Sequence, residues 1–319
     1  MMTLEPVRTL PVEEYLLSRL AFSPDGAVVA IGHKHFRTYA VEGGETRAEF
    51  HFPEFLARLR FSPDGRYIAA ANVGDNHPAT QGRVELFDAA TGQSLWSVAE
   101  PQPVEAMAFA PDGVRLFWNA GSAIAMARCE PRQALAPQPL EQLRVLDLAH
   151  GASGLAVFAR ETVGSVQQIE GAELIFRKFR LLRLDGAGHA IGNLDLGIGA
   201  GVHALSPDGK LLACEMVDFK NNERHVALID VETGVEANLL PLEANTLPVL
   251  GFGLGSEFFL CMKEDANEPY NRLRIWRTSD LKLVGEATLD LAFHSFATCL
   301  EYSLVACLGG GQLAMFSVA

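Results

Sequence analysis

Short apolar runs alternate with polar turns along the whole chain. The turn Ser-Pro-Asp-Gly occupies residues 23–26, 62–65 and 206–209, and Ala-Pro-Asp-Gly at 110–113 is a near copy. Each turn follows a strand-like segment that ends in Phe or Leu and precedes another apolar run. Proline presets the first corner of such a turn, aspartate bonds the backbone two residues on, and glycine accepts a positive φ. Every copy therefore predicts a tight hairpin between two strands.

The spacing of these turns indicates a repeat. Their consecutive prolines lie 39, 48 and 96 residues apart, and the last interval is twice 48. A degenerate copy fits the long gap at residues 150–154, and the aligned apolar runs extend the series through 253–255 and 300–302. Units of about 40 to 50 residues with four short strands each are typical of propeller blades. We therefore expect an all-β, seven-bladed β-propeller built from four-stranded antiparallel blades.

The second strand of each unit is apolar on both faces, as expected for a strand between neighbouring blades. Three of the five cysteines, Cys214, Cys261 and Cys307, occupy the same position in this strand. No two cysteines form a Cys-x-x-Cys pair and their number is odd, so neither a zinc site nor a disulfide framework is indicated. We expect these cysteines to fill the core as small hydrophobic side chains.

The two ends of the chain are predicted to share one blade. The last unit stops after its third strand, at residues 312–318, and residues 4–10 supply a spare strand ahead of the first unit. Pairing these two segments closes the ring and removes open strand edges. We therefore expect residues 1–319 to form a single propeller domain, in which the amino-terminal strand completes the last blade.

The third strands resemble those of the WD-repeat (WD40-like) β-propeller family, with degenerate repeats. Phe87-Asp88 and Ile229-Asp230 stand where that family usually has its Trp-Asp pair. The Gly-His pair that opens a typical repeat is missing, so the buried polar network of that family is not expected. Other propellers also carry the Pro-Asp-Gly turn, including the periplasmic type of the Tol system. The WD-repeat resemblance covers nearly the whole chain and implies a propeller that serves as a scaffold for protein partners.

The net charge and the hydropathy of the chain argue against two classes of binding partner, nucleic acids and membranes. The net charge of −13 argues against a general affinity for nucleic acid, whose phosphates need clustered Lys and Arg. No apolar run is long enough to span a membrane, and the first 22 residues lack the apolar core of a secretory signal. We expect a cytoplasmic protein, monomeric by itself, with protein partners and with no nucleic-acid or membrane partner.

One segment of the chain is basic. Arg177, Lys178, Arg180 and Arg183 punctuate the expected third strand of unit four, and we call them the basic stripe. The favoured interpretation is a solvated strand whose long side chains cover apolar neighbours, and the alternative is contact with an anion or an acidic partner.

Long polar loops are the best candidate for a partner-binding surface. The connections between second and third strands are short in units one, three and seven, but long at residues 72–83, 160–173, 218–225 and 263–272. Rigid scaffolds commonly place function on loops, and Tyr and Arg are suitable interface anchors. The predicted partner-binding residues are Asp75, Asn76, His77, Lys220, Asn221, Asn222, Glu223, Arg224, Glu264, Asp265, Asn267, Glu268, Tyr270, Asn271 and Arg272.

The histidines do not predict a metal site. His33 and His35 lie two residues apart, with Asp75 and His77 in the equivalent loop of the next unit, but a metal site usually needs three or four well-directed ligands. His203 falls at a repeat position that is apolar in other units, so we expect a satisfied core histidine.

No motif assembles an acid, a base or a nucleophile, because the nucleophile elbow, the Walker loop and the His-Glu-x-x-His pattern are all missing. We therefore expect a non-catalytic scaffold without cofactor, catalytic residue or metal ligand. The alternative is a propeller enzyme, such as a lactonase-like hydrolase with a metal or small-molecule site at the central channel. The inner strands end in Leu-Ala-Phe, Leu-Arg-Phe, Met-Ala-Phe and His-Ala-Leu, which supply few carboxylate, Asn or His ligands for it.

Overall fold

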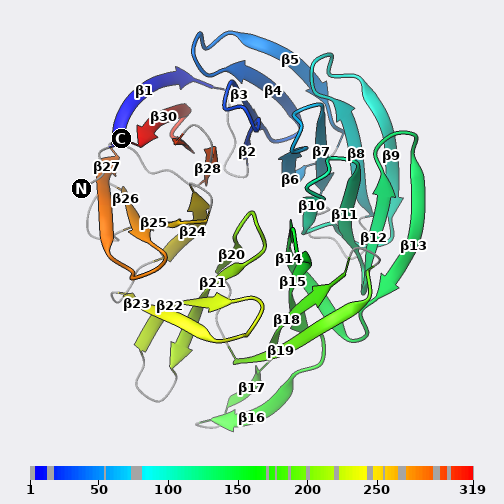
Figure 1. Cartoon of the computed structure of the whole chain (residues 1–319), viewed down its shortest axis with the longest axis vertical. Coiled ribbons are helices and arrows are strands. Elements are labelled where there is room, and N and C mark those ends of the chain that lie inside the picture. The colour runs from blue at the N-terminus through cyan, green and yellow to red at the C-terminus, as the bar shows by residue number, and fades with distance from the viewer. Residues whose placement is uncertain are drawn as a thin grey trace.

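The molecule is a ring of β-sheets around a central axis (Figure 1). This computed structural model describes residues 4–12, 18–53, 55–72, 81–169, 172–176, 178–185, 188–198, 202–218, 223–242, 247–253, 256–264, 271–289, 295–299 and 303–318. Within these residues the chain forms seven four-stranded antiparallel sheets and one two-stranded sheet. The prediction of a propeller with four-stranded antiparallel blades is confirmed.

Each four-stranded sheet runs outward from the axis in the order of the chain. The innermost strands are β2 (Arg19–Phe22), β6 (Leu56–Phe61), β10 (Met107–Phe109), β14 (Leu143–Gly151), β20 (His203–Leu205), β24 (Leu247–Gly253) and β28 (Ser295–Cys299). The second strands are β3 (Val28–Gly32), β7 (Tyr67–Asn72), β11 (Arg115–Ala120), β15 (Gly154–Glu161), β21 (Leu211–Asp218), β25 (Phe258–Glu264) and β29 (Leu304–Gly309).

The outer half of each sheet is built in the same way. The third strands are β4 (His35–Ala40), β8 (Gly82–Asp88), β12 (Ala123–Arg128), β18 (Lys178–Leu184), β22 (Glu223–Asp230), β26 (Asn271–Arg277) and β30 (Gln312–Val318). The fourth strands are β5 (Thr46–His51), β9 (Ser94–Glu100), β13 (Gln133–Pro139), β19 (Ala190–Ile198), β23 (Glu236–Leu242), β27 (Leu283–Leu289) and β1 (Leu4–Pro11).

The amino-terminal strand closes the ring. Strand β1 pairs antiparallel with β30, from Leu4 opposite Val318 to Pro11 opposite Gln312. The sheet of β28, β29 and β30 is therefore completed by the other end of the chain, as the sequence predicts (Figure 1).

The core lies between the sheets. The described residues form seven apolar clusters, each of which is shared by two neighbouring sheets, and one of these joins the first sheet to the last. Cys214 and Cys307 are fully buried in such clusters, as predicted, and burial raises the pKa of both thiols to about 12. The side chain of Cys261 lies outside the described residues.

The repeat turns have the expected geometry. Gly26, Gly65, Gly113 and Gly209 all have φ between +65° and +73°. The serine that opens each full copy is buried, and its hydroxyl accepts a hydrogen bond from the second strand, for example from the Tyr67 amide to Ser62 Oγ at 2.9 Å. This chemistry explains why the turn recurs at the same point of the three blades that carry a full copy.

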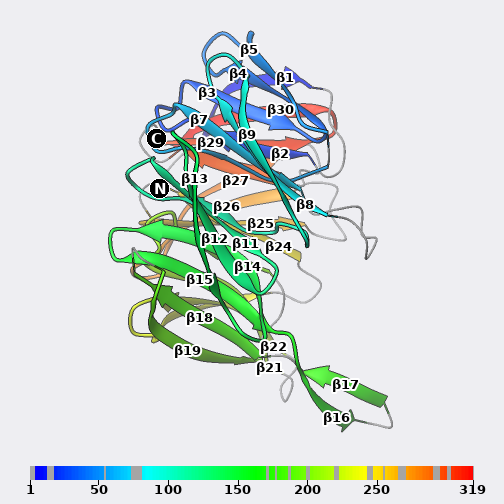
Figure 2. The same ribbon diagram turned by 90° about the vertical axis from the view of Figure 1, so that its right-hand side faces the viewer.

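Three of the predicted long loops differ from the prediction. In unit four, residues 165–176 form a hairpin of β16 (Ser165–Ile169) and β17 (Ala172–Phe176), which projects beyond the edge of the ring (Figure 2). In units five and six the paired strands extend into the expected loops, so that Asp218 pairs with Glu223 and Glu264 pairs with Asn271. Backbone ladders thus replace both ends of each predicted loop, and residues 219–222 and 265–270 lie outside the described residues.

Candidate functional site

The most distinctive cavity lies on the ring axis. It has a volume of about 970 Å³, and all seven inner strands contribute to its wall, so we call it the central channel. Near the Pro-Asp-Gly turns its lining is mostly apolar, with Phe22, Phe109 and Phe252, and it also contains Asp208 of one such turn. We call this end the apolar mouth.

Farther along the axis the lining becomes basic. Arg19 on β2 and Arg58 and Arg60 on the neighbouring β6 line the channel, and we call them the channel arginines. Arg19 Nε and Arg58 Nη1 both donate to the carbonyl of Ala57, at 2.9 and 3.0 Å, and Arg60 Nη1 donates to the carbonyl of Leu59 at 3.2 Å. Backbone carbonyls therefore fix all three guanidinium groups in one part of the wall.

The channel arginines repel one another. Burial lowers the pKa of Arg19, and the charges of Arg58 and Arg60 lower it further. Arg60 is exposed to the channel, but partial removal of water by the surrounding wall lowers its pKa, while attraction to Asp147 opposes that shift. Arginine remains cationic near neutral pH despite such shifts, so three positive charges share this part of the channel.

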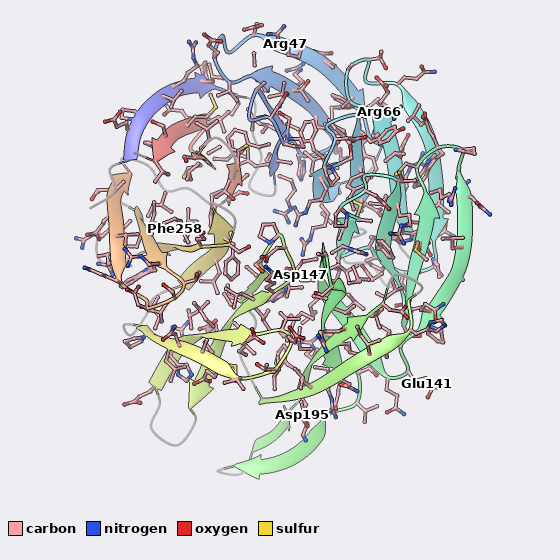
Figure 3. All side chains as sticks on the ribbon, viewed as in Figure 1. Arg47, Arg66, Glu141, Asp147, Asp195 and Phe258 are labelled. Atoms are coloured by element: carbon pink, nitrogen blue, oxygen red, sulfur yellow. The ribbon has the colours of Figure 1, made fainter. Side chains whose placement is uncertain are left out.

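Asp147 is the carboxylate whose charge acts on this group, since it opposes the lowering of the Arg60 pKa. It lies on the inner strand β14, near the centre of the ring (Figure 3). Its Oδ1 accepts a hydrogen bond from the Leu148 amide at 2.9 Å, and its Oδ2 accepts one from the Leu205 amide on β20 at 3.2 Å. Asp147 thus joins two inner strands and offsets only part of the positive charge.

The basic stripe differs from the channel arginines, because carboxylates pair with its described members. In the basic stripe, Lys178 pairs with Asp195 at 2.9 Å and Arg180 pairs with Glu161 at 2.7 Å. Arg183 lies 3.8 Å from a Glu232 oxygen, and Arg177 lies outside the described residues. The stripe is therefore a paired, solvated strand, in agreement with the favoured interpretation of the sequence.

Two histidines line the same channel. His150 Nδ1 lies 3.0 Å from the Gly151 carbonyl, so this nitrogen carries the proton, and burial lowers the pKa of the ring. Its Nε2 is buried and has no hydrogen-bond partner among the described residues. His203 packs on the ring of Phe158 at 4.7 Å between centroids, and its partner in the ladder is Cys214, in the same register as the apolar residues of other units.

Comparison with known proteins supports the architecture. No protein-family model matches the chain, and no curated protein matches it by sequence. The β-propeller domain of Cps50 (Swd1) from Myceliophteria thermophila matches with a TM-score of 0.70 at 17% identity, over 99% of this chain and 100% of that chain. The hydrazine synthase of Kuenenia stuttgartiensis matches with a TM-score of 0.69 at 12% identity, over 94% of this chain and 95% of that chain. The chain has the β-propeller fold.

Such low identities show the fold alone. One of these two propellers is named as a domain of a larger protein and the other as an enzyme, so the shared fold does not separate a binding role from a catalytic one. The function has to be argued from the surfaces and cavities of this chain.

Many of the predicted partner-binding residues lie outside the described residues. This group consists of Asp75, Asn76, His77, Lys220, Asn221, Asn222, Asp265, Asn267, Glu268 and Tyr270. The others are at strand ends, where Arg224 pairs with Val217 and Arg272 pairs with Lys263 in the ladders.

Arg224 has a structural partner that the sequence did not suggest. Its Nε donates to Glu215 Oε1 at 2.8 Å, and the Glu215 side chain is only 5% exposed. Loss of Arg224 would leave a buried carboxylate unpaired, so this residue is less suited to act as a free interface anchor than the sequence predicted.

The described residues contain no group of three or more His, Cys, Asp or Glu side chains that could hold a metal ion. His35, one of the two histidines considered above, instead contacts His51 on β5, with 3.1 Å between their Nδ1 atoms. The same part of the chain contains no helix that is both long and apolar enough to cross a membrane.

Proposed function

We propose that this protein is a non-catalytic scaffold that binds protein partners on the face of the ring that carries the connections between second and third strands. The observation that carries the proposal is the projecting β16–β17 hairpin on this face (Figure 2). Its base is held by Thr162, whose amide and hydroxyl donate to the Gln142 carbonyl at 2.8 and 3.0 Å. A rigid base under a projecting element is the arrangement in which loops of a scaffold commonly bind partners.

The unequal height of the rim supports the same proposal. The paired strands β21 and β22 of the fifth blade, and β25 and β26 of the sixth, extend toward this face. In the third blade, by contrast, the two residues Gly121 and Ser122 join β11 to β12. A partner resting on the raised side of the rim would contact several blades at once.

The enzyme alternative receives less support from the channel. A metal-dependent hydrolase needs carboxylate, Asn and His ligands from several blades at one depth, whereas the channel arginines would repel a cation there. Asp147, the nearby carboxylate, already accepts two backbone hydrogen bonds.

The proposal is tested by quantitative affinity capture from a lysate of the native organism. A variant in which residues 164–176 are replaced by a short Gly-Ser turn is compared with the wild type and with the double variant Glu45→Ala/Arg47→Ala. The control pair is an exposed ion pair of 2.7 Å beside β5, remote from the hairpin (Figure 3).

We expect the hairpin variant to lose at least one wild-type partner by about tenfold or more, because a few anchors carry most of the binding energy of an interface. The control variant should keep that partner. Equal capture by all three proteins would reject the proposed surface, and a metal-dependent hydrolase activity of the purified wild type would reject the non-catalytic role.

A further inference from the structure

The central channel has an excess of positive charge in a protein whose net charge is −13. Arg19, Arg58 and Arg60 come from two neighbouring inner strands, and the positive charge of Arg58 acts on both Arg19 and Arg60 and lowers their pKa. Among the described residues none of the three lies within ion-pair distance of a carboxylate, whereas the basic stripe is paired throughout its described part. Within the described residues, the channel wall thus keeps three cations close together, and Asp147 offsets only part of their charge.

Among the described residues, two carboxylates line the channel, and both already accept hydrogen bonds from the protein. Asp147 accepts hydrogen bonds from two backbone amides. Asp208, in the turn after β20, accepts hydrogen bonds from Ser206 Oγ at 2.7 Å and Ser256 Oγ at 3.0 Å, and it lies 3.6 Å from Lys210 Nζ. Neither carboxylate is free to move onto the channel arginines without leaving these partners.

Grouped cations in a partly desolvated site are unfavourable for folding, since each charge loses hydration and gains repulsion. An anion that binds between them offsets the repulsion and gives the guanidinium groups hydrogen-bond acceptors in place of water. We propose that the central channel binds a small molecule with a multiply charged oxyanion, either a phosphate ester or a polycarboxylate, between Arg19, Arg58 and Arg60. This site is independent of the proposed partner surface on the rim.

Guanidinium chemistry suits this ligand class. A guanidinium group presents a planar fork of N–H donors that matches the oxygens of phosphate and carboxylate in pairs. Each channel arginine donates from one nitrogen to a backbone carbonyl, which fixes its plane and leaves other donors for a ligand. Backbone anchoring of this kind reduces the side-chain entropy that is lost on binding.

The dimensions and lining of the channel fit an organic anion. Its volume of about 970 Å³ lies at the upper end of the usual range for small-molecule sites. Phe22, Phe109 and Phe252 at the apolar mouth offer contacts to the carbon skeleton, while the channel arginines contact the charged group. A ligand of this class would therefore enter with a defined orientation.

The proposal is tested by isothermal titration of the purified full chain with pyrophosphate and with citrate, at ionic strength held constant with chloride. The test variants are Arg58→Gln and Arg60→Gln, which remove charge and keep polarity. The matched control is Arg47→Gln, at the outer edge of the ring, where the guanidinium pairs with Glu45 instead of facing the channel (Figure 3). Circular dichroism of each variant verifies the fold before titration.

We expect saturable binding of at least one probe, weakened about tenfold or more by each channel variant and unchanged by Arg47→Gln, because hydrogen bonds to charged groups dominate such sites. Arg58→Lys should give an intermediate affinity, since it keeps the charge and loses the fork. Binding of pyrophosphate alone would identify a phosphate ligand, and binding of citrate alone a polycarboxylate. Dissociation constants above about 1 mM for both probes, or an equal loss in the Arg47 variant, would overturn the proposal.

Discussion

At the residue scale, the repeat turn depends on a glycine in the left-handed region. Gly209 has φ +69°, and a Cβ there would lie 3.3 Å from the Gly151 amide nitrogen and 3.5 Å from the Ala149 carbonyl oxygen. Gly209→Val should therefore lower the free energy of unfolding by about 1 to 3 kcal/mol, measured by urea denaturation. Gly311 is not a suitable unstrained control, because it has φ +75° and a side chain there would be strained as well.

A better control for that prediction is Gly192→Ala. Gly192 lacks a left-handed φ, and the atom nearest to an added Cβ would be Arg183 Nε at 3.1 Å, on a flexible side chain. This variant should cost less than Gly209→Val. Equal losses would show that left-handed geometry does not determine the stability of the turn.

His150 gives a prediction for pH dependence. Burial is the main cause of its lowered pKa, Arg115 lowers it further, and Asp112 and the Gly151 carbonyl oppose the shift. In the unfolded chain His150 has a pKa near 6.5, so as the pH falls it binds a proton there before it does so in the folded protein. The free energy of unfolding therefore decreases from about pH 7 down to the folded pKa. His150→Asn should flatten the loss of stability between about pH 7 and pH 5 in urea titrations, since Asn can still donate to the Gly151 carbonyl.

The matched control is His189→Asn, because the His189 side chain is 72% exposed. Its pH profile should follow that of the wild type. A His150→Asn profile parallel to the wild-type profile would contradict the assignment of a buried neutral imidazole.

At the scale of the elements, strand β1 is the test of ring closure. Deleting residues 1–10 would expose the edge of β30 and remove Leu10 from the cluster shared by the first and last sheets. We expect aggregation or a clear fall in the melting temperature, because an open strand edge and a lost apolar contact act together. Removal of residues 165–176, whose described strands form a separate two-stranded sheet, should change the melting temperature less. An unchanged melting temperature after deletion of β1 would show that its pairing does not hold the ring.

At the scale of the whole molecule, we propose that residues 1–319 form one cooperative domain. Trp96 and Trp118 pack in the cluster between the second and third sheets, with 6.3 Å between ring centroids, and Trp276 packs between the fifth and sixth. A Trp276→Phe variant and a Trp96→Phe/Trp118→Phe variant therefore report on opposite sides of the ring by fluorescence. Each variant should show one transition, with the same midpoint by fluorescence and by circular dichroism. A fluorescence midpoint that differs from the circular-dichroism midpoint would indicate separately unfolding parts.

The sequence allowed prediction of the repeat because turn chemistry is local. The ladder places Leu20 opposite Ile31, Leu59 opposite Ala70 and His203 opposite Cys214, in agreement with the alignment of units. The hairpin of residues 165–176 was missed, because unit four lacks the Pro-Asp-Gly turn and its extra strands were assigned to a loop.

The channel arginines were missed for a different reason. Arg19 and Arg58 both lie three residues before the phenylalanine that ends the inner strand, Phe22 and Phe61. Superposing the first two units would have shown the match, but only the closed ring shows that these positions face one cavity. The channel arginines come from two blades, and their side chains meet only in the tertiary structure. The spacing of residues within one repeat therefore does not predict the positive charge of the channel.

The pairing of β1 with β30 also determines when the ring can form during synthesis. The two strands lie about 300 residues apart, and ribosomes add about 5 to 20 residues per second, so β1 waits roughly 15 to 60 seconds for its partner. During that interval β1 stays unpaired and the ring of sheets is incomplete. Such late, long-range contacts slow folding, and they make early association with a chaperone more valuable for this chain than for a protein whose contacts are local.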